Sequence, residues 1–312
     1  MELDLDNTLF NLNETLNCGQ VFRWSHDHQR WIGVVQDTAI TVQQDDRRLL
    51  VRTHPAKDDT FIQNYFRFDD DLRRITAGLN RDPVIERALK ALQGLRLVRQ
   101  DPWECLISFI CATYASIPRV RRMVENLSTR YGATIDWEGR TYHSFPSCEA
   151  LSKAKLDDLI GCGVGYRARY IHETARQVAA QDHALDALPR LSYEAAGREL
   201  RRFMGVGPKA ADCILLFSME KLEAFPIDVW IARILFERYR EWLPVQSMEN
   251  RKVTSAQYRS LGAFARRYFG GYAGYAQQYL YHYYRTQDAR LRKSGASSGS
   301  PIGAAPSSTG AV

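Results

Sequence analysis

The chain lacks the features of a membrane protein, a disulfide-stapled protein and a zinc protein. No apolar run approaches the roughly 20 residues that span a bilayer. The acidic residues 1–4 do not resemble a signal peptide. The six cysteines include no C-x-x-C pair, which disfavours a zinc site, an iron–sulfur cluster or a disulfide framework. We therefore expect an intracellular protein with no metal site and with reduced, mostly buried cysteines.

Lysine is scarce, because only 8 of the 42 basic residues are lysines and 34 are arginines. Arginine suits bidentate phosphate contacts and stacking against bases, and the net charge of +6 favours an anionic partner. A GC-rich genome would produce the same arginine bias. Composition therefore favours a nucleic-acid partner without establishing one.

Hydrophobic patterns divide the chain into a β-rich beginning and a helical remainder. The segments 21–24, 31–35 and 39–42 are rich in strand-forming residues, and the polar residues 25–28 predict a turn. Helical spacing begins near residue 58. Beyond residue 102 we predict helices over 104–115, 118–131, 166–180, 193–204, 209–218, 229–239 and 256–269. The aromatic-free, Ser/Gly/Ala/Pro-rich residues 294–312 predict a disordered tail.

The most informative motif is the run Gly205-Val206-Gly207-Pro208-Lys209 between two predicted helices. Gly205 and Gly207 permit a positive φ and close approach to a phosphate, and Pro208 suits the first turn of a helix. Backbone N–H groups at such a turn can bind phosphate. The motif predicts a helix-hairpin-helix over about residues 193–219, which grips a DNA backbone without reading its sequence.

Two ionisable residues accompany this turn. Lys209 would lie at the positive end of a helix dipole, so we expect dipole and burial to lower its pKa from about 10.4 and make it a nucleophile. Phosphate binding as a point charge is the alternative. Asp228 follows 19 residues later and could cap the next helix, stabilise a cationic sugar, or do both. Cys213, one turn after Lys209, is by default a core cysteine.

At these residues the sequence resembles the helix-hairpin-helix-GPD superfamily of DNA glycosylases. Further blocks narrow the resemblance to the 8-oxoguanine DNA glycosylase family: Cys18–Trp24, Arg99–Cys105, Ser108–Cys111, Gly165–Tyr170 and Tyr272–Gln277. The resemblance implies an α+β protein with an N-terminal antiparallel, TBP-like sheet domain (residues 1–95) and a mostly helical catalytic domain (residues 96–290).

The resemblance also implies what the protein acts on and where. It implies a monomer that acts on double-stranded DNA containing 8-oxoguanine, away from any membrane. No redox cofactor or catalytic metal is implied. The compartment would be the cytoplasm or nucleoid of a prokaryote, or the nucleus of a eukaryote.

The resemblance assigns a chemical role to four residues. Lys209 would attack C1′ of a flipped nucleotide and form a Schiff base, with strand cleavage by β-elimination, and Asp228 would stabilise the developing positive charge. Gly19 would offer its backbone carbonyl to the N7–H of 8-oxoguanine, where normal guanine has a lone pair. Since a buried unpaired acceptor costs about 1–3 kcal/mol, this carbonyl can sort damaged from normal bases. Gln277 would bind the Watson–Crick edge.

Other matched residues would hold the DNA. Cys213 and Tyr281 would sandwich the flipped base, and Tyr166 would be the wedge where the base leaves the stack. Arg119 and Arg167 would hold the orphaned cytosine. Without the family match, Tyr166 would be interpreted as a core tyrosine, and Arg119 and Arg167 as solvated helix arginines.

Two positions depart from the family pattern. Tyr114 stands where an asparagine contacts the cytosine, and it cannot reproduce an amide's hydrogen bonds. We therefore expect weaker discrimination for cytosine opposite the lesion. Trp230 stands where the family often has a histidine near a phosphate, and an indole donates one hydrogen bond without charge.

Three other functions compete with this interpretation. A glycosylase that removes alkylated bases by activating water would not need Lys209. A non-catalytic DNA-binding module would not need Gly19, Gln277 and the Lys209/Asp228 pair together. An iron–sulfur endonuclease is disfavoured by the missing C-terminal cysteine cluster.

Overall fold

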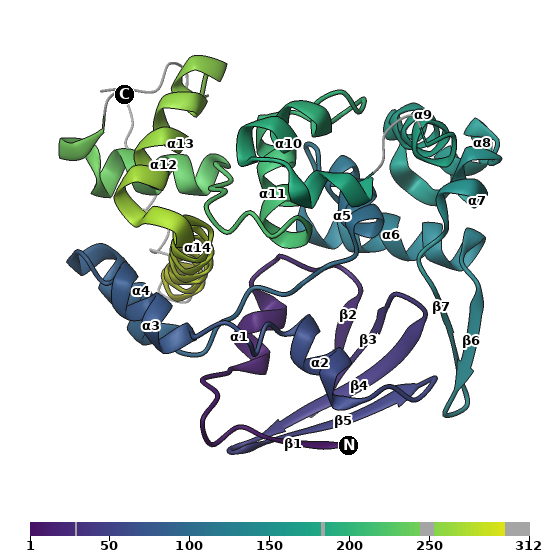
Figure 1. Ribbon diagram of the computed structural model, residues 1–312, viewed down its shortest axis with the longest axis horizontal. Coiled ribbons are helices and arrows are strands. Elements are labelled where there is room, and N and C mark those ends of the chain that lie inside the picture. Colours follow the sequence, from purple (N-terminus) through teal and green to yellow (C-terminus); the bar gives the residue numbers. More distant parts are fainter. Residues whose placement is uncertain (29, 182–184, 244–252, 297–312) are drawn as a thin grey trace, which may run out of the picture.

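The computed structural model describes residues 1–28, 30–181, 185–243 and 253–296, which form a sheet beneath a helical body (Figure 1). The sheet has antiparallel strands in the order β1-β5-β4-β3-β2. They are β1 (Glu2–Asp4), β2 (Trp24–Asp27), β3 (Arg30–Val35), β4 (Thr38–Asp45) and β5 (Arg48–His54). The predicted α+β fold class is confirmed.

Helices make up most of the remaining described chain. They are α1 (Leu12–Asn17), α2 (Asp59–Tyr65), α3 (Leu72–Leu79), α4 (Pro83–Ala91), α5 (Pro102–Cys111), α6 (Ile117–Tyr131), α7 (Cys148–Ser152), α8 (Leu156–Leu159), α9 (Arg167–Ala179), α10 (Tyr193–Leu200), α11 (Pro208–Ser218), α12 (Val229–Arg238), α13 (Ser255–Phe269) and α14 (Ala273–Ala296). Every predicted helix is present, although α5 and α10 end about a turn early. Among the described helices, none is both long and apolar enough to cross a bilayer.

Short side chains and prolines determine where several helices begin. Asp101 caps α5 by accepting the backbone N–H of Glu104 at 2.8 Å, and Pro102 takes the first helical position. Asp82 and Pro83 begin α4 in the same way. Proline lacks the N–H that would be unpaired there, so Asp-Pro is a strong helix start.

Local patterns were misleading at two places. Residues 21–23, predicted as strand, lie outside β2, whereas Ser25 to Asp27, predicted as a turn, pair with β3. A hairpin of β6 (Thr134–Trp137) and β7 (Arg140–His143) interrupts the region predicted to be helical. Its strands are only four residues long, too short to show a clear alternating pattern.

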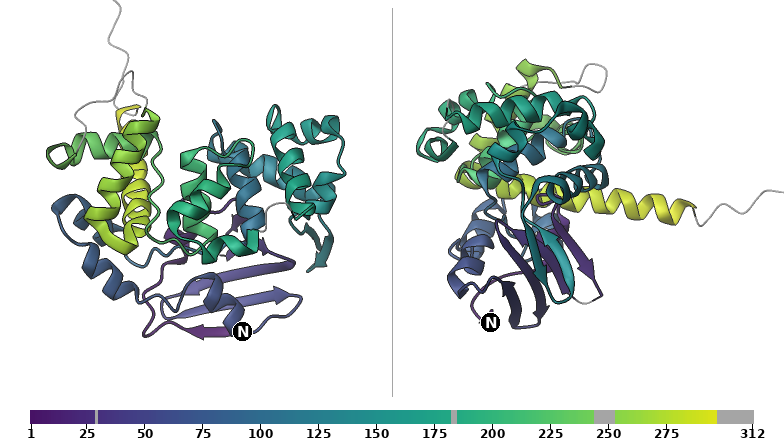
Figure 2. Two further views of the ribbon diagram at one scale, coloured as in Figure 1. Left: turned by 45° about the horizontal axis from the view of Figure 1, so that its top comes forward. Right: turned by 90° about the vertical axis from the view of Figure 1, so that its right-hand side faces the viewer.

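The buried hydrophobic residues form two clusters, one mainly in the sheet domain and one mainly in the helical body. Trp24 and Val42 of the sheet pack with Ile62 of α2 in one cluster. The second cluster consists of buried residues of the helical domain together with residues of α3 and α4. Helix α4 packs against α14 (Figure 2). Helix α14 continues to Ala296, and the rest of the predicted tail, residues 297–312, lies outside the described residues.

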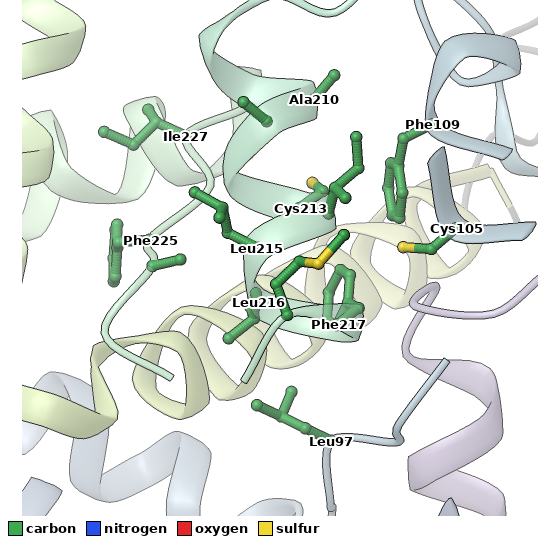
Figure 3. Close-up of a cluster of buried hydrophobic side chains, with 14 of the residues drawn as sticks. Leu97, Cys105, Phe109, Ala210, Cys213, Leu215, Leu216, Phe217, Phe225 and Ile227 are labelled. Carbon is green, nitrogen blue, oxygen red and sulfur yellow. The ribbon is translucent and has the colours of Figure 1, made fainter. Parts of the chain in front are cut away.

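Helix α11, which follows the hairpin turn, runs through the middle of the helical cluster. Its residues from Ala210 to Ser218 are buried. Cys213 lies opposite Phe109 and Cys105 of α5 (Figure 3). Because α11 is buried from Ala210 onward, it holds its first turn, which carries Lys209, in a fixed position.

Candidate active site

The hairpin turn depends on one of its two glycines. Gly205 has a φ of 86°, and a Cβ there would lie 2.6 Å from Cδ2 of Tyr170, so conformation and packing both require glycine. Gly207 has φ −86° and ψ −179° as the residue before α11, and a Cβ there would meet open space. The expectation of a positive φ is therefore wrong for Gly207. Its backbone is exposed, so a phosphate could still approach it closely.

Lys209 lies on the first turn of α11, and its Nζ is 5.2 Å from the ring centroid of Phe109. Burial lowers the pKa of the Lys209 amine, but the negative charges that Cys213 and Asp228 can carry raise it more, so the net shift is upward. The expected lowering of this pKa is wrong, because neighbouring acids outweigh burial. The aromatic face also favours the ammonium form.

Cys213 is buried beside this amine. Burial raises the pKa of its thiol to about 11, so the thiol is neutral near pH 7. Asp228 is then the acid whose charge matters for Lys209 at neutral pH. The neutral thiol therefore behaves as a small apolar group beside Lys209.

Asp228 caps α12 and couples to Lys209 at the same time. One carboxylate oxygen, Oδ1, accepts the backbone N–H groups of Trp230 and Ile231 at 3.0 and 2.9 Å. Burial raises the pKa of this carboxyl, while those two N–H groups and Lys209 lower it. The two roles considered from the sequence are compatible, since the cap uses Oδ1 and leaves Oδ2 for a cation.

Gly19 and Tyr281 come from opposite ends of the chain and meet at this site. Gly19 has a φ of 88°, and a Cβ there would lie 3.0 Å from Ile117, 3.3 Å from Arg285 and 3.7 Å from Tyr281. Tyr281 couples electrostatically to both Lys209 and Asp228. It therefore links the predicted recognition carbonyl to the predicted catalytic pair.

The backbone on both sides of Gly19 is held by glutamine side chains. Gln278 Nε2 donates to the carbonyl of Cys18 at 2.8 Å. The fully buried Gln20 donates to the carbonyls of Thr15 and Arg96, both at 2.9 Å. These bonds leave the peptide at Gly19 little freedom, which a recognition carbonyl needs.

Gln277 is buried, and its Oε1 accepts no hydrogen bond from the residues that the structure describes. An unpaired buried amide oxygen costs about 1–3 kcal/mol, so native proteins keep few of them. A guanine edge, with its N1–H and N2–H donors, would satisfy this oxygen.

We expect Gln277→Leu to lower the rate of 8-oxoguanine excision about 10- to 100-fold, through loss of hydrogen bonds to the base. The melting temperature should stay the same or rise, because an unpaired buried amide is replaced by an apolar group of similar shape. Single-turnover excision and thermal denaturation measure the two effects.

The neighbouring substitution Gln278→Leu is the matched control. It should lower the melting temperature, since the carbonyl of Cys18 loses its donor. A Gln277→Leu protein that melts early and excises at the native rate would contradict a base-binding role.

The predicted DNA-contacting side chains differ in exposure. Tyr114 is 94% exposed with a φ of 51°, and Tyr166 is 55% exposed. Arg119 on α6 is also exposed, and Trp230 is half-buried. The hydroxyl of Tyr166 donates to the carbonyl of Thr113 at 3.4 Å. The two outward-facing tyrosines therefore come from loops that touch each other.

Arg167 does not face outward as expected. Its side chain is buried, and its guanidinium donates to the carbonyls of Thr113 and Val164 while lying over the ring of Tyr166. These carbonyls accept three of its five N–H groups, so Arg167 supports the loop at Thr113, and the cytosine contact stays a prediction. Arg167 holds the residue before Tyr114 in place.

Sequence reasoning missed several residues at the site, among them Phe109, Arg285 and Gln278. Phe109 and Gln278 lie inside or beside quoted motifs, but nothing in their spacing shows that they touch Lys209 or Cys18. Within the described ranges, no group of three or more His, Cys, Asp and Glu side chains could hold a metal ion.

Two family models together match most of the chain. The 8-oxoguanine DNA glycosylase N-terminal domain matches residues 2–106, and the HhH-GPD superfamily base excision DNA repair protein matches residues 107–253. The chain is 36% identical over 224 residues to a probable N-glycosylase/DNA lyase of Methanothermobacter thermautotrophicus, covering 65% of this chain and 68% of that protein. It is 30% identical over 317 residues to the N-glycosylase/DNA lyase of Saccharomyces cerevisiae, covering 86% and 82%.

A solved structure agrees with these sequence matches. The 8-oxoguanine glycosylase/lyase of Clostridium acetobutylicum, in complex with double-stranded DNA containing cytosine opposite 8-oxoguanine, superposes with a TM-score of 0.82. The two sequences are 30% identical, and the match covers 92% of this chain and 98% of that chain.

Proposed function

Since the chain belongs to the 8-oxoguanine DNA glycosylase family of the helix-hairpin-helix-GPD superfamily, we propose that it excises 8-oxoguanine from duplex DNA and then cleaves the strand as a lyase. The observation that carries this proposal is the meeting of Lys209, Asp228 and Tyr281 at one site. Gly19 joins them through its contact with Tyr281. A non-catalytic DNA-binding module has no use for this arrangement.

In the proposed reaction, neutral Lys209 Nζ bonds to C1′ of the flipped nucleotide as the bond from C1′ to the base breaks. The base leaves with the electron pair and takes up a proton. One proton of the new secondary ammonium group goes to the departing base, and the other goes to the ring oxygen O4′ as the C1′–O4′ bond breaks, which gives the Schiff base. Loss of a C2′ proton expels the 3′ phosphate. In this proposal the charge of Asp228 stabilises the cationic sugar before the new bond is complete.

In the proposed selection step, the base enters between Cys213 and Tyr281. The carbonyl of Gly19 accepts the N7–H that only the oxidised base carries, and Gln277 binds the opposite edge. Two observations support these assignments. Gln278 fixes the backbone beside Gly19 through a hydrogen bond to Cys18, and Gln277 Oε1 has no donor among the described residues. We also infer that the protein acts as a monomer in the compartment that holds the genome, because one chain supplies every group named here.

The test is excision from three matched duplexes that contain 8-oxoguanine, guanine or 3-methyladenine. We expect base release and strand cleavage only with 8-oxoguanine, together with a covalent protein–DNA adduct when borohydride is added. Release of 3-methyladenine without an adduct would instead identify a water-activating glycosylase for alkylated bases.

Tyr114→Asn should increase the preference for cytosine opposite the lesion, because an amide restores hydrogen bonds that a phenol cannot form. We expect the native protein to excise 8-oxoguanine opposite all four bases at similar rates and the variant to favour cytosine about 10-fold, the value of one good hydrogen bond. Single-turnover rates on the four duplexes measure this. A strict cytosine preference in the native protein would contradict the prediction.

A further inference from the structure

Arg285 lies at the entrance to the proposed base pocket, one turn after Tyr281 on α14. Its guanidinium carbon is 4.9 Å from the ring centroid of Tyr281. Nη1 donates to the hydroxyl of Tyr281 at 3.2 Å, and Nη2 donates to the carbonyl of Asn17 at 3.1 Å. The guanidinium is therefore fixed both to α14 and to the segment that leads into Gly19.

Nη1 of Arg285 borders the same space as Gly19. A Cβ at Gly19 would lie 3.3 Å from Nη1, and the Gly19 carbonyl carbon is bonded to that same Cα. One of the two N–H bonds of Nη1 is used by Tyr281. Among the described residues, no acceptor takes the other. The site thus places a carbonyl acceptor next to an available N–H donor.

Nearby acids leave this donor available. Asp228 couples electrostatically to Arg285, but among the described residues no hydrogen bond joins the two side chains. Glu14, the acid on the adjoining helix α1, is engaged by His282, with 2.8 Å between Oε2 and Nε2. Arg121 on α6 couples electrostatically to Arg285 as a like charge, and its buried Nε has no hydrogen-bond partner within the described part of the chain. The coupled positive charges of Arg285 and Arg121 favour a ligand that presents a partly negative oxygen.

The damaged base presents that pattern on its five-membered ring. In 8-oxoguanine the N7–H donor stands next to the C8=O acceptor, as in a lactam. In guanine the same edge carries an acceptor at N7 and a C8–H. We propose that Arg285 Nη1 donates a hydrogen bond to O8 while the Gly19 carbonyl accepts N7–H. The proposal rests on the proposed function and adds a second contact that normal guanine cannot make.

Arg285→Met tests the proposal, because methionine fills the space without a donor. We expect single-turnover excision of 8-oxoguanine to fall about 10- to 100-fold, the value of a hydrogen bond from a charged donor. Arg285→Lys should recover part of the rate. An abasic duplex offers no O8, so strand cleavage of abasic DNA should fall much less than excision in both variants, by no more than the coupling of Arg285 to Asp228 accounts for.

Arg47→Met is the control for the loss of one positive charge, since Arg47 lies between β4 and β5 with its side chain 80% exposed. It should excise at the native rate. Native-rate excision by Arg285→Met would overturn the proposal, and so would an equal loss of excision and abasic cleavage, which would indicate a general role in DNA binding or folding. Failure of the native protein to excise 8-oxoguanine would instead overturn the proposed function.

Discussion

Lys209→Gln is expected to abolish both the borohydride-trapped adduct and strand cleavage, and to lower base excision on the order of 10⁴-fold, as removal of a nucleophile does elsewhere. Glutamine matches most of the lysine chain but carries no amine that can attack C1′. Because the surrounding residues of α11 are buried, the variant should keep the position of the hairpin. Single-turnover kinetics and denaturing gels of trapped protein–DNA adducts measure these outcomes.

Lys90→Gln is the matched control. Lys90 lies on α4 with its side chain 75% exposed and pairs with Glu86 one turn earlier, and a surface pair of this kind contributes little. This variant should form the adduct at the native rate. An undiminished adduct from Lys209→Gln would place the nucleophile on another amine and remove the mechanism.

Asp228→Asn is expected to lower excision about 10²- to 10³-fold, the usual effect of removing one charge-stabilising group from a transition state. Asparagine caps helices about as well as aspartate, so Oδ1 can still accept the N–H groups of Trp230 and Ile231. The melting temperature should therefore change little. Excision rates and thermal denaturation of the same preparation separate catalysis from capping.

The same substitution should move the pH dependence of the lyase step. Attack needs the neutral amine, and the pKa of Lys209 is raised partly by Asp228. Removing this negative charge lowers that pKa, so the rise in abasic cleavage with pH should begin at a lower pH in Asp228→Asn. A profile that moves to higher pH, or native rates in the variant, would show that Asp228 acts only as the N-cap of α12.

Asp228→Ala completes the comparison. It removes both the charge and the cap, and loss of an N-cap costs about 1 kcal/mol of folding stability. Its excision rate should match that of Asp228→Asn, while its melting temperature should be lower. If only Asp228→Ala loses activity, the carboxylate acts through the start of α12 alone.

Much of the architecture could be predicted because it is encoded locally. Asp-Pro pairs start α4 and α5, and helical spacing locates most of the predicted helices. The glycine-rich turn before α11 could also be predicted, because its signal lies in five consecutive residues, 205–209. Where the local signal was short or ambiguous, as in the β6–β7 hairpin and at residues 21–27, prediction failed.

Side-chain surroundings could not be predicted, because they depend on residues distant in the chain. Arg167 looks like a solvated helix arginine, but carbonyls at Thr113 and Val164 hold it inside. The pKa of Lys209 rises because α11 packs Cys213 and the start of α12 places Asp228 beside it. Burial lowers this pKa and the neighbouring acids raise it, so the net direction depends on how the folded chain places them.

The sequence by itself determined the hairpin turn and the helix after it, because turn chemistry and motif spacing are properties of neighbouring residues. Its resemblance to the family indicated a glycosylase, with Lys209 and Asp228 as the predicted reactive pair. Only the tertiary structure decided how the pocket is built. In the described part of the chain, Gln277 Oε1 has no hydrogen-bond partner. Gln278 bonds to the backbone next to Gly19, and Arg285 lies beside that glycine. Hydrogen bonds between the two ends of the chain exist only after the sheet domain and α14 have packed together.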